Sequence, residues 1–374
     1  MIGNVDLCLT CNGIRLELTD VLQSMAITTT EEARLPTRLK RAGFPLRGSM
    51  RDFFVGIDGG GTKTRCAISD ETGKVIGQGL AGGCKVNKHI SLKSAQENVA
   101  SAVAIAMEKS GILNRDMTSV CFGIPGIEAP DGLENARQLV KSTGLNDHVL
   151  MVNDAKIAWA GALVCRPGVV VVSGNGFDVC GVSEHGEEII GLSSPGILYG
   201  ASCEDIEHQL LYESLVANEG SPLLVKMLNL FGLREQDELI RNVRTGKYSW
   251  KELSGKLLPF VVEAAQDDDQ SAIHILEWAG RTLGLAVVMV MKSLRIHKTP
   301  VSFIGGAFEV CGGMLSRPFE ATVLSRFPEA TIVFPRLKPA GGALLLAMRA
   351  VGRKIDETLT RHIAHTLSTK TFEV

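Results

Sequence analysis

The chain has 374 residues, of which 45% are apolar and 21% are charged, and its formal net charge is −2. These values predict a globular protein of about two domains with a large buried core. A net charge this close to zero gives no long-range field that would attract nucleic acid or an anionic membrane, so we expect a small-molecule partner instead.

The cysteines and the apolar segments indicate a cytoplasmic protein. The nine cysteines are odd in number and scattered, which predicts no disulfide framework. Cys8 and Cys11 have C-x-x-C spacing, but no second pair accompanies them, so we expect neither a zinc nor a redox site there. The N-terminus lacks the compact apolar segment of a signal peptide, and the apolar stretch 273–294 is interrupted by charges that favour a buried core helix over a membrane span.

Residues 1–49 show no sustained helical or strand period and become basic and proline-containing from Arg34 to Arg47. Strong patterning begins only after Met50. We therefore expect an N-terminal extension over 1–49 that is disordered or not translated, with Met50 as a candidate start.

A β-meander of three strands is predicted from Phe53 to Gly79, with a turn at Glu71–Lys74. The first two strands are joined by Asp58, Gly59, Gly60, Gly61, Thr62, Lys63 and Thr64. The glycines of this loop let backbone amides approach phosphate. Thr62 and Lys63 offer a hydroxyl and a cation, and Asp58 can hold hydrated magnesium. The loop lacks the Gly-Lys-Ser/Thr ending of a Walker loop. A glycine-rich hairpin without a ligand is the alternative, but three glycines behind an aspartate favour phosphate binding.

Alternating elements follow: a helix over 94–110, a strand over 119–124, a helix over 133–142 and a strand over 149–152. This order is typical of an α/β domain. In the loop before the first of these helices, Asn87 and His89 could face a polyol, although a turn residue is the simpler interpretation of Asn87.

Asn153 and Asp154 stand at the carboxyl end of a predicted strand, where open α/β sheets bind ligands. A carboxylate at Asp154 can accept the proton of a substrate hydroxyl that attacks the γ-phosphate of ATP. The alternative is that Asp154 caps the helix that begins at Ala155.

A second strand, turn and strand unit covers 168–182 and resembles the opening unit. Its turn, Ser173-Gly174-Asn175-Gly176, predicts a second cradle for phosphate, with a plain hairpin as the alternative. Residues 205–297 are predicted to be mostly helical. Gly305 and Gly306 then follow a strand and permit close approach of a flat ligand such as adenine. A final helix is predicted from near Gly341 to about Thr366.

In this order, the motifs resemble the N-acetylglucosamine kinase branch of the family named after the benzoyl-CoA reductase ATPase subunits, within the actin-like ATPases. The resemblance covers about residues 53 to 352. The motifs that carry it are Val55–Thr64, Gly123–Ile127, Val152–Ala155, Ser173–Gly176 and Ile304–Gly306.

The resemblance implies an α/β protein with a duplicated ribonuclease H-like fold and ATP in the cleft between two domains. We expect an N-terminal domain over 50–155, with a C-terminal helix over 345–366 packing back on it. The C-terminal domain is expected over 156–344, with a helical insertion over 205–297.

The resemblance also implies a function and the residues that perform it. Asp154 is implied as the catalytic base, Asp58 as a magnesium residue acting through water, and Asn87, Asn153 and Asp154 as sugar contacts. ATP and Mg²⁺ are the implied cofactors, Gly305 and Gly306 lie on the nucleotide side, and a homodimer is compatible with the family.

Two departures from the family pattern concern the acceptor side. The family's Gly-Thr-Gly-Ser turn reads Gly174-Asn175-Gly176-Phe177 here, which removes both hydroxyls. A substrate loop that carries carboxylates in the family reads Ile197-Leu198-Tyr199-Gly200-Ala201. The sequence therefore leaves open which sugar or alcohol is phosphorylated.

Two other functions remain as alternatives to a sugar kinase. One is the ATPase activator of a 2-hydroxyacyl-CoA dehydratase, which holds an iron-sulfur cluster between subunits; the scattered cysteines of this chain do not match its pattern. The other is a nucleotide- or sugar-binding protein without kinase turnover.

Overall fold

The computed structural model describes residues 10–11, 14–15, 52–87, 90–113, 116–145, 149–191, 201–216, 221–245, 247 and 256–367. The chain divides into two compact units, Met1–Met50 and Arg51–Val374. In the first unit, the described residues form an antiparallel pair, β1 (Thr10–Cys11) and β2 (Ile14–Arg15). Cys8 of the C-x-x-C pair lies outside the described residues.

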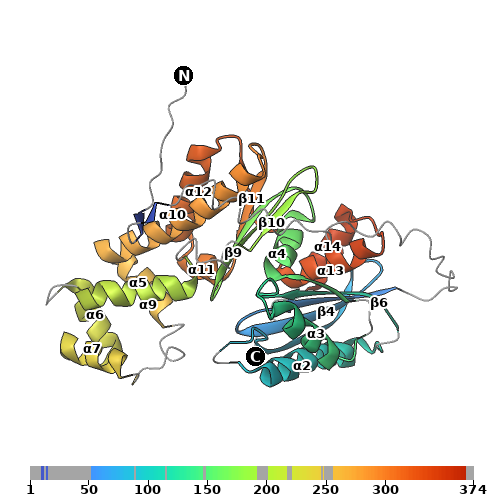
Figure 1. Cartoon of the computed structure of the whole chain (residues 1–374), viewed down its shortest axis with the longest axis horizontal. Helices are drawn as coiled ribbons and strands as arrows, with labels where there is room; N and C mark the ends of the chain where they lie inside the picture. The colour runs from blue at the N-terminus through green and yellow to red at the C-terminus, as the bar shows by residue number, and fades with distance from the viewer. Residues whose placement is uncertain are drawn as a thin grey trace. The chain divides into compact units, whose positions relative to one another are not determined.

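The described part of the second unit contains two five-stranded sheets (Figure 1). The first has the order β5-β4-β3-β6-β7 and consists of β3 (Phe53–Gly59), β4 (Lys63–Asp70), β5 (Val75–Gly82), β6 (Met117–Ile124) and β7 (Val149–Asn153). The second has the order β10-β9-β8-β11-β12 and consists of β8 (Gly168–Ser173), β9 (Phe177–Val182), β10 (Glu188–Ile190), β11 (Pro300–Ile304) and β12 (Thr331–Ile332).

The two sheets repeat one topology. In each, the first three strands form an antiparallel meander. The fourth strand pairs in parallel with the first, and the fifth pairs in parallel with the fourth. The predicted first meander and its repeat in the strand, turn and strand unit over 168–182 are confirmed, and the third strand of the second meander, β10, was not predicted. The arrangement is the duplicated α/β fold that the resemblance implied. The two glycine turns occupy the same place in the repeat, because each joins the first strand of a sheet to the second.

Helices α2 (Leu92–Ser110) and α3 (Gly132–Ser142) cover one face of the first sheet. Helix α2 begins where the Ser91 hydroxyl accepts from the amide of Ser94, and it ends at Gly111 in the left-handed conformation. Its buried face consists of Ala95, Val99, Ala102, Val103 and Ala106, at helical spacing. Small residues on both sides bring the helix close to the sheet, since a side chain at Gly79 of β5 would overlap the backbone of α2.

The second sheet is accompanied by helices from the segment predicted to be helical and from the region after β11. They are α5 (Cys203–Val216), α6 (Pro222–Phe231), α7 (Gln236–Arg244), α9 (Leu257–Gln266), α10 (Gln270–Ser293), α11 (Gly306–Cys311) and α12 (Gly313–Arg326).

Helix α10 is the one helix in the described residues that is long and apolar enough to cross a membrane, and 56% of its most apolar window is buried inside the fold. It packs against α12, and Gly280 and Gly284 make the contact close. A Cβ at Gly284 would lie 2.9 Å from the carbonyl oxygen of Phe319. Helix α10 therefore packs as a core helix, as predicted.

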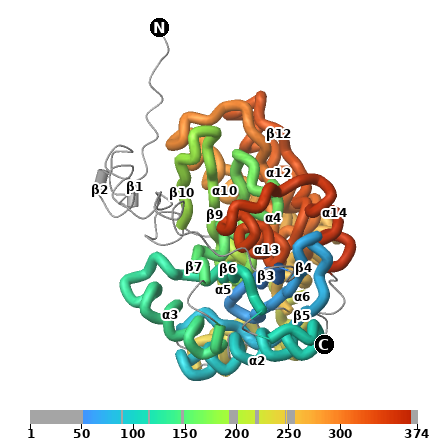
Figure 2. Tube along the Cα trace, turned by 90° about the vertical axis from the view of Figure 1, so that its right-hand side faces the viewer, coloured from blue at the N-terminus to red at the C-terminus, as the bar shows by residue number. Residues whose placement is uncertain are grey.

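Two helices connect the sheets, α4 (Asp154–Leu163) and α13 (Pro339–Ala350), and they lie side by side (Figure 2). Helix α4 leaves β7 of the first sheet and packs on β8, β9 and β11 of the second. Helix α13 follows β12 of the second sheet and packs on β3, β4 and β6 of the first. Each sheet is thus covered by a helix that follows, along the chain, the last strand of the other sheet.

The contact between α4 and α13 is made by backbone. A Cβ at Gly342 would overlap the Ile157 carbonyl oxygen and the Gly161 amide nitrogen, and a Cβ at Gly161 would lie 2.9 Å from the Lys338 carbonyl oxygen. On its other side α13 meets Gly56 of β3, where a Cβ would lie 2.6 Å from the Leu344 amide nitrogen. Glycine is required here for close approach.

The prediction of one final helix from near Gly341 to about Thr366, and of a continuous helix over 345–366, was wrong. The structure has two helices, α13 and α14 (Glu357–Thr366). Gly352 adopts φ 82°, which ends the first helix, and the Asp356 carboxylate accepts from the Leu359 amide at 2.9 Å to begin the second.

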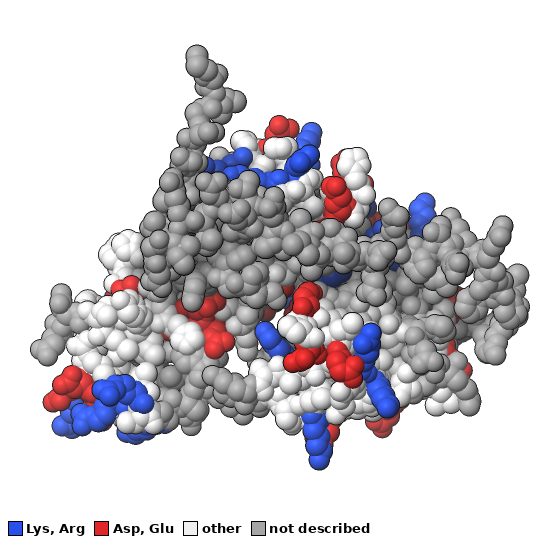
Figure 3. Space-filling model, viewed as in Figure 1, with Lys and Arg blue, Asp and Glu red and all other residues white. Residues whose placement is uncertain are grey.

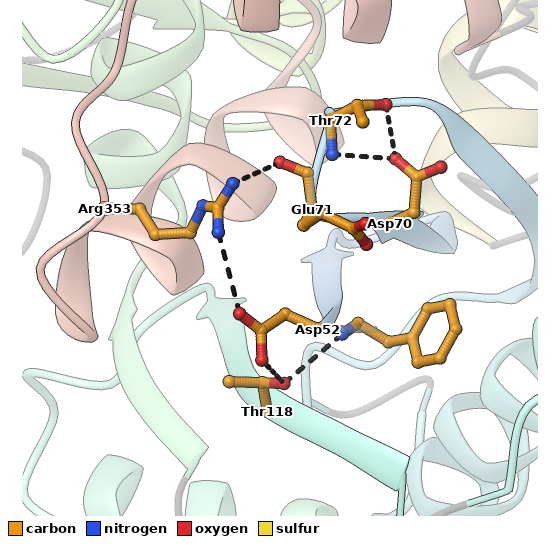
Figure 4. Close-up of polar contacts among 7 residues, drawn as sticks. Asp52, Asp70, Glu71, Thr72, Thr118 and Arg353 are labelled. Atoms are coloured by element: carbon orange, nitrogen blue, oxygen red, sulfur yellow. Dashed lines mark hydrogen bonds and ion pairs between the residues drawn. The ribbon is translucent and has the colours of Figure 1, made fainter. Parts of the chain in front are cut away.

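Arg353 holds the connection between these helices against the first sheet (Figure 4). Its guanidinium lies 3.6 Å from the Asp52 carboxylate and donates to the Glu71 carbonyl at 2.6 Å. Asp52 in turn accepts from the Thr118 hydroxyl at 3.1 Å. The break in the helix therefore lets one cation join three parts of the chain.

The helix crossing predicts the effect of a single methyl group. We expect Gly342→Ala to lower the free energy of unfolding by about 3 kcal/mol, because the new Cβ meets backbone that cannot rotate away. Chemical denaturation with urea measures this. Gly313→Ala is the matched control, since its Cβ would meet only the Arg317 side chain at 3.5 Å; equal losses in both variants would contradict the assigned role of the crossing.

Candidate active site

Asp58 ends the buried part of β3 and faces Arg65, its cross-strand partner on β4. A guanidinium nitrogen of Arg65 donates to the Asp58 carboxylate at 3.3 Å. Burial raises the pKa of Asp58, and the charge of Arg65 opposes that shift. Asp58 is thus a partly compensated buried carboxylate at the base of the predicted phosphate loop.

The loop itself is a tight connection between β3 and β4. The Gly60 amide donates to the Lys63 carbonyl at 2.9 Å, while Thr62 and Lys63 are exposed. A Cβ at Gly59 would lie 2.6 Å from the Cys84 sulfur, so only glycine fits there. The loop thus exposes the two polar side chains that a phosphate cradle would use.

Residues after β5 support this loop from behind. The Cys84 amide donates to the Gly60 carbonyl at 2.9 Å, and a side chain at Gly83 would overlap the Gly61 carbonyl. Thr64 is buried and interacts with the Cys84 thiol, whose pKa burial raises to about 12. Cys84 is therefore a neutral packing group.

The second turn, between β8 and β9, is closed by a hydrogen bond from the Gly174 amide to the Gly176 carbonyl at 2.8 Å. The Gly174 carbonyl accepts from the Cys203 amide at 2.8 Å, which ties the turn to the start of α5. Asn175 and Gly176 remain exposed. Phe177, the first residue of β9, is 8% exposed and therefore packs inward.

Gly305 brings the end of β11 against the second turn. It adopts φ 121°, and a side chain there would overlap the Ser173 carbonyl. The Ser173 hydroxyl donates to the Ala201 carbonyl at 2.6 Å, so this serine is committed to holding the backbone. Gly305 and Gly306 thus adjoin the Ser173–Gly176 turn.

The two glycine turns face each other. A Cβ at Gly61 would lie 4.0 Å from Nδ2 of Asn175, and a Cβ at Gly176 would lie 4.0 Å from Nζ of Lys85. No feature of the sequence fixes this distance. The structure therefore brings together two turns that the sequence only suggested as partners.

Asp154 is the first residue of α4, and its neighbour Asn153 is the helix cap. Oδ1 of Asn153 accepts from the Ala155 amide at 2.6 Å, whereas Oδ1 of Asp154 meets the same amide at 3.1 Å. The alternative that Asp154 is the N-cap is therefore wrong, because Asn153 has that position. The predicted contact of Asn153 with substrate stays a prediction.

Burial raises the pKa of Asp154 to about 7, and the charges of Asp178, Asp58 and Glu128 add to the shift, while Lys85 opposes it. Burial also raises the pKa of Glu128, which a hydrogen bond from Asn153 opposes. A carboxylate with a pKa near neutrality is matched to accepting a proton from a hydroxyl at neutral pH.

Lys85, Asp178 and Glu128 are site residues that the sequence did not indicate. Asp178 follows Phe177 in β9, and Glu128 lies beyond the carboxyl end of β6. Each is a single charged residue in a loop or strand, which in a sequence is usually a solvated side chain. Their common role appears only in the structure, because the fold brings these three charged groups near Asp154.

The predicted sugar contact Asn87 is exposed and forms a local turn, since its Oδ1 accepts from the Ile90 amide at 3.0 Å. This bond agrees with the turn interpretation and leaves the sugar contact a prediction. His89, Leu198 and Tyr199 lie outside the described residues.

The residues at the site fit a nucleotide and magnesium. Gly61, Gly174 and Gly176 leave open space where side chains would stand, since the nearest atom to a Cβ at each would lie 4.0 Å away. Within the described residues, no group of three His, Cys, Asp or Glu side chains is arranged to hold a metal directly. A magnesium ion coordinated mainly by phosphate and water, with Asp58 beyond the water, matches this donor set.

Comparisons with known proteins show what the segment around this site is similar to. Residues 55–194 match the model of the BadF/BadG/BcrA/BcrD ATPase family. The matched segment contains both glycine turns, Asp58 and Asp154, so the family domain includes the motifs that face each other in the structure.

Relatives of the family domain extend over most of the chain. An N-acetylmuramic acid/N-acetylglucosamine kinase of Clostridium acetobutylicum is 25% identical over 311 residues, which are 79% of this chain and 98% of the relative. An N-acetyl-D-glucosamine kinase of Dictyostelium discoideum is 26% identical over 333 residues, 80% of this chain and 99% of the relative.

Solved structures share the fold. A protein of Chromobacterium violaceum named for N-acetylglucosamine kinase has a TM-score of 0.60 at 21% identity, covering 79% of this chain and 98% of its own. A glucokinase of the ROK family from Streptomyces griseus, in complex with glucose and AMPPNP, has a TM-score of 0.55 at 17% identity, covering 80% and 100%. These likenesses confirm the two-sheet fold.

One face of the molecule shows how the described charged side chains are distributed. On the face in Figure 3, described acidic and basic side chains are interspersed without a broad area of one sign. A cavity of about 280 Å³ lies at the far end of α4 from Asp154 and is lined by Val164, Cys165, Arg349 and Arg353, among others. It shares no residue with the glycine turns.

The raised pKa of Asp154 predicts a stability change. The folded protein binds this proton more tightly than the unfolded chain, so stability falls as pH rises toward about 7 and the full penalty applies above it. We expect Asp154→Asn to raise the free energy of unfolding at pH 8 by roughly 1–3 kcal/mol after allowance for solvent screening, and by less at pH 5, with a matching rise in melting temperature. Thermal unfolding at both pH values measures this. The exposed Asp237→Asn serves as control, and a gain that does not depend on pH would contradict the prediction.

Proposed function

We propose that this protein is an ATP-dependent kinase that phosphorylates a hydroxyl of a sugar or amino sugar of the N-acetylglucosamine or glucosamine type. The observation that carries the proposal is Asp154, a carboxylate with a pKa of about 7 that lies beside two facing glycine turns. The names of the relatives, all of them amino-sugar kinases, support the substrate class.

The proposed reaction uses residues from both sheets. Amides of the loop from Gly59 to Thr64 and of the turn from Gly174 to Gly176 hold the phosphates of ATP, and Gly305 and Gly306 lie on the adenine side. Asp58 holds magnesium through water, and the ion would offset phosphate charge. The Asp154 carboxylate takes the proton of the acceptor hydroxyl as its oxygen bonds to the γ-phosphorus.

The acceptor side rests on fewer observations. We infer that Asn87 and Asn153 contact the sugar, with Asn153 also capping α4. Phe177 packs inward, so the second turn presents Asn175 as its polar side chain. We expect a cytoplasmic enzyme whose partner is a small molecule, and a homodimer is compatible with the proposal.

A panel of acceptors tests the function. Purified protein with Mg-ATP is assayed for ADP release with amino sugars, acetamido sugars, neutral hexoses and polyols. We expect turnover with N-acetylglucosamine or glucosamine well above the rate without an acceptor. Tight ATP binding without ADP release across the panel would instead support a binding protein.

Asp154→Asn is the decisive variant. We expect it to lower kcat by at least about 100-fold, because the amide cannot accept the hydroxyl proton, while the Kd for ATP measured by calorimetry changes little. Retention of full turnover in a folded Asp154→Asn variant would overturn the assignment of the base.

A further inference from the structure

The two residues before Lys85 are held by hydrogen bonds of their backbone, one of which joins them to the first glycine loop. The amide of Cys84 donates to the Gly60 carbonyl at 2.9 Å. The Gly83 carbonyl accepts from Nδ2 of Asn98, on helix α2, at 2.8 Å. Because these bonds anchor the two residues before it, Lys85 has a defined starting point beside the phosphate loop.

The side chain of Lys85 extends from the first loop to the second turn. Its Nζ lies 4.0 Å from the position that a Cβ on Gly176 would take. The two turns approach each other equally closely nearby, where a Cβ on Gly61 would lie 4.0 Å from Nδ2 of Asn175. The ammonium therefore lies where residues of both sheets meet.

The charges around this point need a cation. The carboxyl groups of Asp58, Asp178 and Glu128 all act on the carboxyl group of Asp154 and raise its pKa. Arg65 is engaged with Asp58 at 3.3 Å. A triphosphate that enters such a site adds further negative charge, which only cations and oriented amides can offset.

We propose that Lys85 is a catalytic residue whose ammonium contacts the transferring phosphoryl group between the two glycine turns. This inference rests on the proposed kinase function. An exposed lysine is more often a solvated side chain, but this one follows two residues whose backbone is anchored, and it ends against the turn of the opposite sheet.

The role of Lys85 follows from the bonds that change. The acceptor oxygen bonds to the γ-phosphorus, the bond from that phosphorus to the bridging oxygen breaks, and ADP leaves with the electron pair. The hydroxyl proton passes to Asp154. Lys85 stays protonated throughout and offsets charge on the phosphoryl oxygens, which is electrostatic stabilisation of the transition state.

Lys85→Met tests the proposal, because methionine keeps the length of the side chain and removes the charge. We expect kcat to fall about 100-fold, as when one donor to a developing charge is removed, with Lys85→Arg restoring part of it. The Kd for AMPPNP with Mg²⁺ should rise relative to the Kd for ADP, since only AMPPNP carries the γ-phosphoryl group.

The pH profile of kcat/KM gives a readout that a structural role would not move. Lys85 opposes the rise in the pKa of Asp154, which burial, Asp178, Asp58 and Glu128 favour. Loss of the cation should therefore move the acid limb to higher pH. Lys93→Met is the matched control, because Lys93 lies on α2 and pairs only loosely with Glu97 at 4.0 Å; we expect wild-type values.

The outcomes separate this inference from the proposed function. If the wild-type protein phosphorylates an acceptor and Lys85→Met has the same kcat and the same ratio of Kd values for AMPPNP and ADP, the role of Lys85 is overturned and the kinase function stands. Absence of wild-type turnover with every acceptor would remove the kinase. In that case the ratio of the Kd values for AMPPNP and ADP still decides whether Lys85 contacts the γ-phosphoryl group.

Discussion

The close crossing of α4 and α13 is the constraint on which the rest of the second unit depends. Gly161 and Gly342 allow backbone to meet backbone, and Gly56 allows α13 to lie directly on β3. Helix α4 begins with Asp154, and β3 ends at Asp58 and Gly59. One close backbone contact thus sets the distance between Asp154 and the loop that follows Asp58, so the loops do not have to define it.

Much of the fold could be predicted because local patterns agree with the tertiary structure. The strands around Asp58 and around Ser173–Gly176 alternate or form short apolar runs bounded by glycine turns, and the structure has them where the patterns indicate. The break between α13 and α14 was missed because Gly352 and Asp356 are weak signals when they stand alone in a helical pattern. The structure adds the contacts of Arg353 with Asp52 and Glu71, which hold the chain where it turns.

The candidate site likewise has a part that the sequence predicts and a part that only the structure shows. A glycine loop behind an aspartate can be recognised in a sequence because the spacing itself serves the chemistry, and Asp154 can be recognised by its place after a strand. Lys85, Asp178 and Glu128 carry no such local signal. Their role arises from a charge balance at one carboxylate, which depends on where three separate segments meet. Which of Asn153 and Asp154 caps helix α4 could likewise be decided only from atomic positions, since either residue type can cap a helix.

The charge balance also links the strength of the base to the approach of the two sheets. Asp154 lies on the helix that leaves the first sheet, whereas Asp178, the largest charged influence on its pKa after burial, lies on β9 of the second. Any movement that separates the turns weakens this repulsion and readmits water, and both changes lower the pKa of Asp154 toward its ordinary value. A carboxylate with a lower pKa is a weaker base. Asp154 therefore has its full basicity only when Gly61 and Asn175 face each other, which is also the arrangement that the proposed binding of one nucleotide by both turns requires.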